Sequence, residues 1–377
     1  MAAPYNLAMG VHEVLVRGTG AVGLAAALAL GRQGLRVALL GTEAAAGARQ
    51  DVRAYALNAA SVRLLSSLKV WDALPADART QVHDMHIEGD APGASLDFSA
   101  WSQGLAELAW IVDAAELETA LQAAVGYAPH VQRVDAEVAA PLQVLAEGKE
   151  SATRSRLGAN MPRQAYGHRG IAARLRSEQA HAGLARQWFR SPDVLALLPL
   201  DRPQAGHGYG LVWSVPDSQA DTLMALSDAA FEATLSDATG GAAGRLQLVS
   251  ARAQWPLSTA QADAVHGPGW VLVGDAAHVV HPLAGQGLNL GLGDVAVLAE
   301  ELAARESWRS PGDARIGARY ARRRRLPVQA MAQLTDALWQ LFAHPAPLAR
   351  ELRNRGLSLV NHLPPLKRLL TGRALGG

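Results

Sequence analysis

The stretch that decides the fold runs from Gly269 to Val295 and reads GWVLVGDAAHVVHPLAGQGLNLGLGDV. Its first part, Trp270 to Val273, has the apolar composition of a buried strand, and Gly274 and Asp275 follow where that strand ends. A carboxylate at the carboxyl end of a strand lies where open α/β sheets bind their ligands. We therefore predict that Asp275 accepts hydrogen bonds from a ligand at the edge of a sheet.

The second part of this stretch is a glycine-rich turn, Leu283 to Gly287, that leads into an apolar helix near Leu288. Free backbone N–H groups at a helix start can hold an anion or a polarised carbonyl group. Together with the strand that precedes it, this turn indicates a nucleotide site.

Composition limits the classes of function that remain. The chain has 377 residues, which is enough for two domains or for one large domain with an insertion. A net charge of +1 gives no general attraction to polyanions, so we predict no nucleic-acid partner. Cysteine is absent, which excludes disulfides, thiol catalysis and thiolate metal sites.

No apolar run of the sequence approaches the roughly 18 residues of a membrane span. The first residues, MAAPYNLAMGVHE, also lack the basic and apolar regions of a secretory signal. We therefore expect a cytoplasmic protein.

A second nucleotide motif lies near the start of the chain, between a strand expected at His12 to Arg17 and an alanine-rich helix. Its three glycines have separate tasks in a βαβ unit: a tight turn, close approach of backbone to a pyrophosphate, and packing of helix on strand. The predicted binding residues here are Gly18, Gly20, Ala21, Val22 and Gly23. The acid expected about 20 residues further on, to bind a ribose, is Glu43, whose alternative role is a solvated loop charge.

Arg53 precedes a helix close to this nucleotide motif, in the sequence RAYALN. A guanidinium group there can pair with a pyrophosphate, or it can cap a carbonyl group at the surface. Further along, Asp113 is expected to cap a helix that runs to Val125, with Glu116 at the capping-box position.

The middle of the chain has the pattern of antiparallel strands. Residues 75–110 alternate apolar and polar side chains between Gly-Asp and Pro-Gly turns, and residues 170–215 form a run of strands. The predicted fold is α/β: a Rossmann-like dinucleotide-binding domain with a parallel sheet, a discontinuous and mostly antiparallel second domain, and C-terminal helices. The expected boundaries are 1–70, 111–159 and 263–345 for the first domain, 71–110 and 160–262 for the second, and 346–377 for a basic helical tail.

The order of these motifs carries a family resemblance. It consists of G-x-G-x-x-G, then R-A-Y-A-L-N, an acid-glycine pair at Glu147-Gly148, and finally G-D-A-A-H-x-x-H-P-L-A-G-Q-G-L-N-L-G. The sequence resembles the flavoprotein aromatic hydroxylases with a para-hydroxybenzoate hydroxylase-like fold, and within them the ubiquinone-biosynthesis hydroxylase family.

This resemblance implies FAD as cofactor, NADH or NADPH as electron donor, and oxygen transfer from a flavin C4a-hydroperoxide to the ring of a prenylated phenol. It also implies cofactor-binding roles for Arg53, Gln122, Gly274, Asp275, Pro282, Gly285, Gly287, Leu288 and Asn289. No catalytic base can be named from the sequence. The alternatives are a hydroxylase of another phenolic metabolite and a non-catalytic FAD-binding scaffold.

Three features depart from the family pattern. The middle motif has Glu147 where Asp is usual and is followed by Lys149, and the segment from Pro129 to Leu145 is short. The start of the 113–125 helix has two alanines where an arginine or glutamine is common, which leaves Gln122 as the candidate for the pyrophosphate.

Two further features, a pair of histidines and a basic C-terminal region, each have two interpretations. His278 and His281 suggest a metal site, but no third ligand accompanies them, so we predict flavin-loop architecture and no metal. Residues 301–377 hold 14 Lys and Arg against 5 Asp and Glu. This region is expected either to lie peripherally on the inner membrane or a biosynthetic complex, or to form solvated helix faces.

Overall fold

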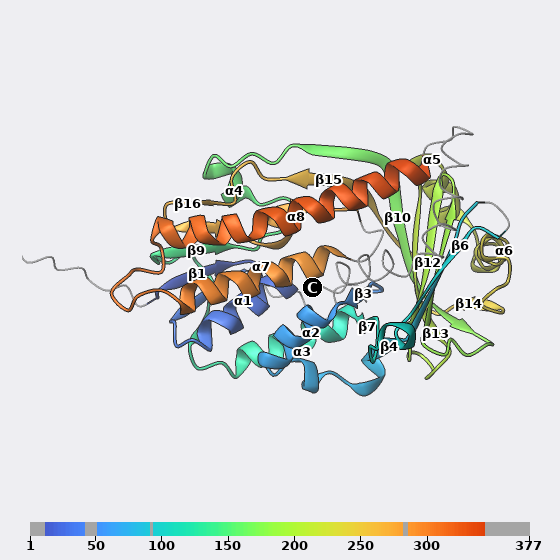
Figure 1. Ribbon diagram of the computed structural model, residues 1–377, viewed down its shortest axis with the longest axis horizontal. Helices are drawn as coiled ribbons and strands as arrows, with labels where there is room; N and C mark the ends of the chain where they lie inside the picture. Colours follow the sequence, from blue (N-terminus) through green and yellow to red (C-terminus); the bar gives the residue numbers. More distant parts are fainter. Residues whose placement is uncertain (1–11, 42–50, 91–92, 282–285, 344–377) are drawn as a thin grey trace, which may run out of the picture.

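The computed structural model describes residues 12–41, 51–90, 93–281 and 286–343. It has two main sheets that lie at opposite ends of the molecule, with the long helix α8 (Ala314–Ala343) extending from one toward the other (Figure 1). The predicted α/β fold, with one parallel and one mostly antiparallel sheet, is confirmed.

The first sheet is parallel except at one edge, where β16 pairs with β17 in the antiparallel direction. Its strands in spatial order are β16 (His266–Gly267), β17 (Trp270–Leu272), β9 (Leu142–Leu145), β1 (Val14–Arg17), β2 (Val37–Leu40) and β8 (Val131–Val134). The four central strands are short, mostly apolar and buried, as expected for a sheet covered on both faces, whereas the edge strands β8 and β16 are not.

Helices that pack on the first sheet complete its hydrophobic core. The βαβ unit has α1 (Ala21–Gly31), which is buried along nearly its whole length between α3 (Ala114–Gly126) and α7 (Gln286–Ala303). Asp113 caps α3 as predicted, because its carboxylate accepts hydrogen bonds from the N–H groups of Ala115 and Glu116. The Glu116 side chain, however, binds Arg202.

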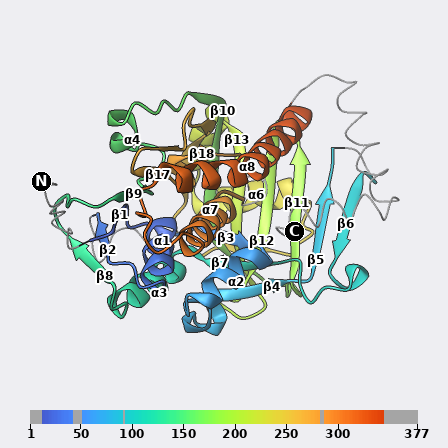
Figure 2. The same cartoon turned by 60° about the vertical axis from the view of Figure 1, so that its left-hand side comes forward.

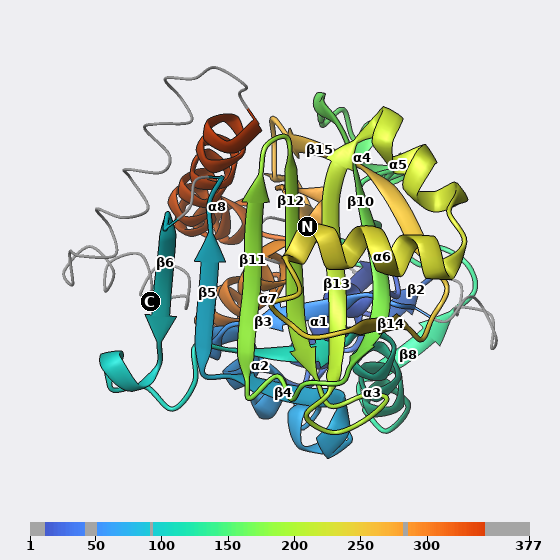
Figure 3. The same ribbon diagram turned by 90° about the vertical axis from the view of Figure 1, so that its right-hand side faces the viewer.

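The second sheet forms a broad platform, seen face-on in Figure 3. Its order is β18 (His278–Val279), β15 (Ala253–Gln261), β10 (Arg163–Ser177), β13 (Gly208–Pro216), β12 (Asp193–Leu200), β11 (Leu184–Arg190), β5 (Asp84–Glu88) and β6 (Ser95–Ser99), with β14 (Leu246–Leu248) beside β10. All pairs are antiparallel except β11 with β5. The helices α5 (Asp217–Ala225) and α6 (Asp228–Thr239) cover one face.

A small third sheet lies between the two large ones and joins segments that are far apart in sequence. It consists of β3 (Ala54–Leu57), β7 (Ala109–Asp113) and β4 (Arg79–Val82), and α2 (Ala59–Ser67) follows β3. Ala54 and Ala56 of β3 pack with Leu198 and Leu200 of the large antiparallel sheet. Figure 2 shows α2 and β3 beside α7 and below the strands of that sheet.

The remaining short elements complete the chain. They are α4 (Ala152–Arg156) and the single-turn helices η1 (Trp71–Ala73), η2 (Ala76–Ala78), η3 (Trp101–Gln103) and η4 (Gly274–Ala276). His278, for which flavin-loop architecture is predicted, lies in the short strand β18, because residues 278–279 pair with the end of β15.

The glycines of the βαβ turn differ in how tightly they are packed, and this difference is testable. A Cβ on Gly23 would lie 2.0 Å from the carbonyl oxygen of Gly18, whereas a Cβ on Gly20 would meet no atom within 4 Å. We expect Gly23→Ala to lower the free energy of unfolding of the apoprotein by about 1–3 kcal/mol, since overpacking forces the backbone to move. Gly20→Ala is the matched control and should cost less than about 1 kcal/mol. Equal losses in denaturant unfolding would contradict this packing argument.

Candidate functional site

The turn between β1 and α1 brings backbone close to backbone. Gly18 has a φ of +110°, and a Cβ there would lie 2.3 Å from the carbonyl oxygen of Ala146, at the end of β9. Because the turn has no side chain at Gly20 and no atom within 4 Å of that position, its outer side is open to a ligand.

The start of α1 is suited to an anion. Its N-cap is Gly20, which makes no side-chain capping bond, and its first turn contains no acidic residue. The first N–H groups of a helix have no intrahelical partner, so the amides of Ala21, Val22 and Gly23 are available to a pyrophosphate. The Val22 side chain faces inward and packs against Gly274 and Gly291.

Asp275 is half-buried just after β17, in η4. In the described part of the chain, no side chain or backbone group donates a hydrogen bond to its carboxylate. Burial raises the pKa of Asp275, while the charges of Lys149, His278 and Arg53 act in the opposite direction. A carboxylate that is partly desolvated and lacks a protein donor fits an acceptor for a ligand hydroxyl group.

Arg53 lies beside this carboxylate. Its guanidinium group forms a forked contact with Asp51 at 2.6–3.1 Å and lies over the Tyr55 ring at 5.5 Å. The hydrogen bond with Asp51 raises the pKa of Arg53, and the Arg53 side chain is still 45 % exposed. Arg53 is therefore held in place with part of its surface free, which suits contact with a polar or anionic ligand.

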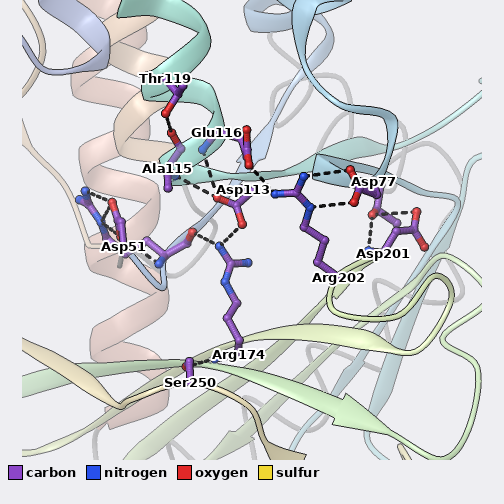
Figure 4. A network of polar contacts seen from close by, with 12 residues as sticks. Asp51, Asp77, Asp113, Ala115, Glu116, Thr119, Arg174, Asp201, Arg202 and Ser250 are labelled. Atoms are coloured by element: carbon purple, nitrogen blue, oxygen red, sulfur yellow. Dashed lines mark hydrogen bonds and ion pairs between the residues drawn. The ribbon is translucent and has the colours of Figure 1, made fainter. Parts of the chain in front are cut away.

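Two arginines, Arg174 and Arg202, connect the antiparallel sheet to the segment at Arg53 and to the start of α3. Arg174 of β10 donates to the Arg53 carbonyl oxygen at 2.6 Å and to the Asp113 carboxylate at 3.0 Å, as Figure 4 shows. Arg202 makes a second bridge, from the antiparallel sheet to Asp77 and Glu116. These contacts join the antiparallel sheet to the segment at Arg53 and to the start of α3.

Behind the site lies a buried charge network centred on Asp294 of α7, which is fully buried. Its carboxylate accepts hydrogen bonds from the Gly274 N–H at 2.8 Å and from Arg324 of α8 at 2.6 Å, and contacts the His278 ring at 2.7 Å. Burial alone would raise the pKa of Asp294, but His278, Arg324 and the Gly274 N–H together lower it. The network fixes the chain on both sides of Asp275.

The predicted residues at the start of α7 differ in whether they contact other parts of the protein. Gly287 lies in the first turn with no atom within 4 Å of a Cβ position, and Leu288 is half-buried against the core. The Asn289 side chain serves the protein: it donates to the Ala56 carbonyl oxygen and accepts from the Asn58 N–H and from the Ser61 hydroxyl. Asn289 therefore ties α7 to β3 and α2.

The middle motif, Glu147-Gly148, is hydrogen-bonded to the residues that follow it. Glu147 accepts hydrogen bonds from Ser151 at 2.5 Å and from Thr153 at 2.8 Å, and Gly148 has a φ of +74°. Arg154 then binds the carbonyl oxygens of Lys149 and Ala276. The longer acid thus forms a compact loop anchored to η4, with Lys149 near Asp275.

The structure gathers most of the predicted residues at one edge of the parallel sheet, but not all of them. Gln122 lies nine residues after the Asp113 cap, about 13 Å further along α3. One turn before it, on the same face of α3, Glu118 lies 4.0 Å from the Arg53 guanidinium group, so Gln122 lies close to the segment at Arg53. Glu43, Pro282 and Gly285 lie outside the described residues. Within the described residues there is no cluster of three or more potential metal ligands.

Comparison with known proteins places this arrangement in a family. The model of the FAD binding domain matches residues 12–105 and 106–335. The chain is 32 % identical to a ubiquinone hydroxylase of Rhodospirillum rubrum, with 97 % of this chain and 90 % of that protein covered. It is 30 % identical to a 3-demethoxyubiquinol 3-hydroxylase of Escherichia coli, with 97 % and 98 % covered.

The chain belongs to the ubiquinone-biosynthesis hydroxylase family of FAD-binding proteins. Its fold is also that of Klebsiella pneumoniae HpxO, solved with FAD and uric acid, at a TM-score of 0.75 and 18 % identity over 99 % of both chains. The predicted FAD cofactor is confirmed, and the open turn at Gly20 and the unpartnered Asp275 carboxylate fit it.

Sequence patterns did not identify the residues that hold the segments of the candidate site in position. Asp294 is a lone charge in the apolar run LNLGLGDVAVL, which is a signal that could have been used. Arg324 lies in the run RYARRRR, where nothing in the sequence distinguishes it from its neighbours, yet it is the partner of Asp294. Arg174 gave no local signal, because its partner Asp113 is 61 positions away in the sequence.

We expect Asp275→Ala to weaken FAD binding by about 10- to 100-fold, because a hydrogen bond to a charged acceptor contributes roughly 1.5–3 kcal/mol. Titration of apoprotein with FAD measures this directly. Asp263→Ala is a control on another carboxylate of the same region, bonded to Asn160, and should leave FAD affinity unchanged. Wild-type affinity in a folded Asp275 variant would remove this residue from the site.

Proposed function

We propose that the chain hydroxylates the aromatic ring of a prenylated phenol in ubiquinone biosynthesis, as an FAD- and NAD(P)H-dependent monooxygenase. The observation that carries this proposal is the similarity, over almost the full length of both proteins, to relatives named for ubiquinone hydroxylation. When bound, FAD supplies the redox chemistry that activates O2 for transfer to the ring.

The residues of this chain bind and orient the cofactor. We propose that the α1 amides bind the pyrophosphate, that Asp275 accepts from a hydroxyl group of the flavin side chain, and that the first turn of α7 approaches the ring. Their geometry supports these roles: the α1 turn is open at Gly20, and Asp275 has no donor within the described protein. Pro282, Gly285 and Glu43 keep their predicted roles as part of this proposal, and so does Gln122.

We also propose the predicted division into an FAD-binding domain and a substrate domain. Separate apolar cores in the two large sheets support it. The strand β4, although it lies within residues 71–110, pairs with β7 in the small sheet between them. The tail at 346–377 lies outside the described residues.

A monooxygenase and a non-catalytic FAD-binding scaffold should differ in two measurements. A monooxygenase should oxidise NADH or NADPH faster when a phenolic substrate is present, and a deletion strain should accumulate a quinone precursor that lacks one ring hydroxyl. A non-catalytic FAD-binding scaffold would show neither effect. We expect both, measured by nucleotide absorbance and by quinone profiling. Accumulation of no precursor would contradict the proposed pathway.

Association with a membrane surface is a further part of the proposal. A polyprenyl tail keeps its precursor in the bilayer, since each buried CH2 contributes roughly 0.8 kcal/mol. No described helix is both long enough and apolar enough to cross a bilayer. The basic run Arg322 to Arg325 on α8 is the candidate docking surface, but Arg323 pairs with Glu300 and Glu301, and Arg324 with Asp294.

Arg322 and Arg325 are the arginines of this run that are exposed and without an ion pair in the described part of the chain, and Leu326 beside them is 74 % exposed. An exposed cation pair next to an exposed apolar side chain suits an anionic lipid surface. Changing all four arginines would also break the buried Asp294 pair, so only these two provide a clean test.

We expect weak, salt-sensitive binding to vesicles that contain anionic lipid, reduced about 30-fold in Arg322→Ser/Arg325→Ser, from roughly 1 kcal/mol per cation. Co-sedimentation at low and high salt measures it. Arg32→Ser/Arg63→Ser removes the same charge from two exposed positions elsewhere and should bind as wild type does. Failure of the wild-type protein to bind at low salt would contradict docking through α8.

A further inference from the structure

The large antiparallel sheet has one face toward helices α5 and α6 and the other toward the FAD-binding part. Ile171 of β10 and Trp213 of β13 pack in the core under α5 and α6. Because side chains alternate along a strand, Gly170 and Ser214, which are paired in register, lie on the opposite face. Arg174, on that same face, reaches Arg53, so this face looks toward the candidate flavin site.

Ser214 is a buried polar residue on this face. It is 5 % exposed, and its hydroxyl group makes no hydrogen bond within the part of the chain that the structure describes. A buried hydroxyl group usually has at least one partner, and leaving it unpaired costs roughly 1–3 kcal/mol.

His168 lies two residues from Gly170 on the same face, diagonally across from Ser214. It is 9 % exposed. Its Nδ1 contacts the Tyr166 carbonyl oxygen at 3.0 Å, and its Nε2 is buried without a partner in the described ranges. The contact at Nδ1 leaves Nε2 as the ring atom that can bind a ligand.

His281 is the third residue of this kind. It is fully buried, and neither ring nitrogen has a partner among the described residues. Its ring lies 4.8 Å from the Tyr166 ring and 6.3 Å from the Trp339 ring, and Trp339 also contacts His168 at 5.7 Å. The second half of α8, which carries Trp339, therefore covers both histidines; Figure 1 shows this helix reaching the end of β10.

An imidazole carries at least one N–H in either charge state, so His281 always buries a donor. Burial, and after it the nearby His168, lower the pKa of His281 to about 3. At neutral pH its ring thus offers one donor and one acceptor, and Ser214 offers the same pair of functions.

We propose that Ser214, His168 and His281 form the polar end of the substrate site and bind an oxygen substituent of the aromatic ring that is hydroxylated. Ser214 and His168 lie on the flavin-side face of the sheet, and His281 follows its strand β18. A shared polar ligand explains three buried polar side chains that lack partners among the described residues. A phenolic hydroxyl group both donates and accepts, which matches all three.

The surroundings suit an aromatic ring. Gly170 has no side chain, and a Cβ there would lie 3.4 Å from the Trp255 indole nitrogen. The Trp255 indole therefore lies against Gly170, with Ser214 on the other neighbouring strand of β10, and can stack on a ring whose hydroxyl group reaches the polar end. This inference rests on the proposed hydroxylation for its substrate class, but the site itself can be tested by binding alone.

The test compares two ligands that differ by one hydroxyl group. FAD-loaded protein is titrated calorimetrically with 4-propylphenol and with propylbenzene. The wild-type protein should prefer the phenol, and Ser214→Ala and His281→Phe should each reduce that preference by about 3- to 10-fold, the loss of one hydrogen bond. An unchanged preference in Ser214→Ala, or no preference in the wild-type protein, overturns the proposal.

Ser177→Ala is the matched control. Ser177 is also buried on β10, but its hydroxyl group donates to the Ala243 carbonyl oxygen and accepts from the Gln179 N–H. We expect it to lower the melting temperature without altering the phenol preference, whereas Ser214→Ala should leave the melting temperature unchanged or raise it. If the phenol preference depends on Ser214 but phenols do not stimulate NAD(P)H oxidation, the site stands and the proposed hydroxylation fails.

Discussion

The carboxylate of Asp294 holds together the three segments on which the cofactor site depends. A charge that is fully buried is costly unless it is paired and hydrogen-bonded, and removing one partner of such a pair is strongly destabilising. Here one carboxylate is satisfied by Arg324 of α8, by His278 of β18 and by the N–H of Gly274. The position of Asp275, one residue later, is therefore set by an interaction that does not itself touch the ligand.

The same principle explains how the substrate sheet is attached. Arg174 and Arg202 extend from that sheet to the start of α3, and Arg174 also binds the backbone of Arg53. Asn289 joins α7 to β3 and α2 from the other side. Residues of the antiparallel sheet and of α7 thus fix the segment that carries Arg53 from two sides.

Local patterns predicted the parts of the fold that short segments determine. The βαβ glycines, the strand before Gly274 and the Asp113 cap each follow from a few adjacent residues, and each is confirmed. The partners of Asp294 and Arg174 could not be predicted in the same way, since they come from distant segments. The run RYARRRR illustrates the limit: its residues look alike in sequence, yet Arg324 is buried in an ion pair and Arg325 is exposed.

FAD titration of the Asp294→Asn apoprotein tests most directly whether this buried network sets the geometry of the cofactor site. Asparagine keeps the size of the side chain but removes the charge that pairs with Arg324. For a variant that circular dichroism shows to be folded, we expect FAD affinity at least about tenfold below that of the wild-type protein, equivalent to about 1.4 kcal/mol. Wild-type affinity in the folded variant would contradict the account, because Asp275 would then hold its position without Asp294.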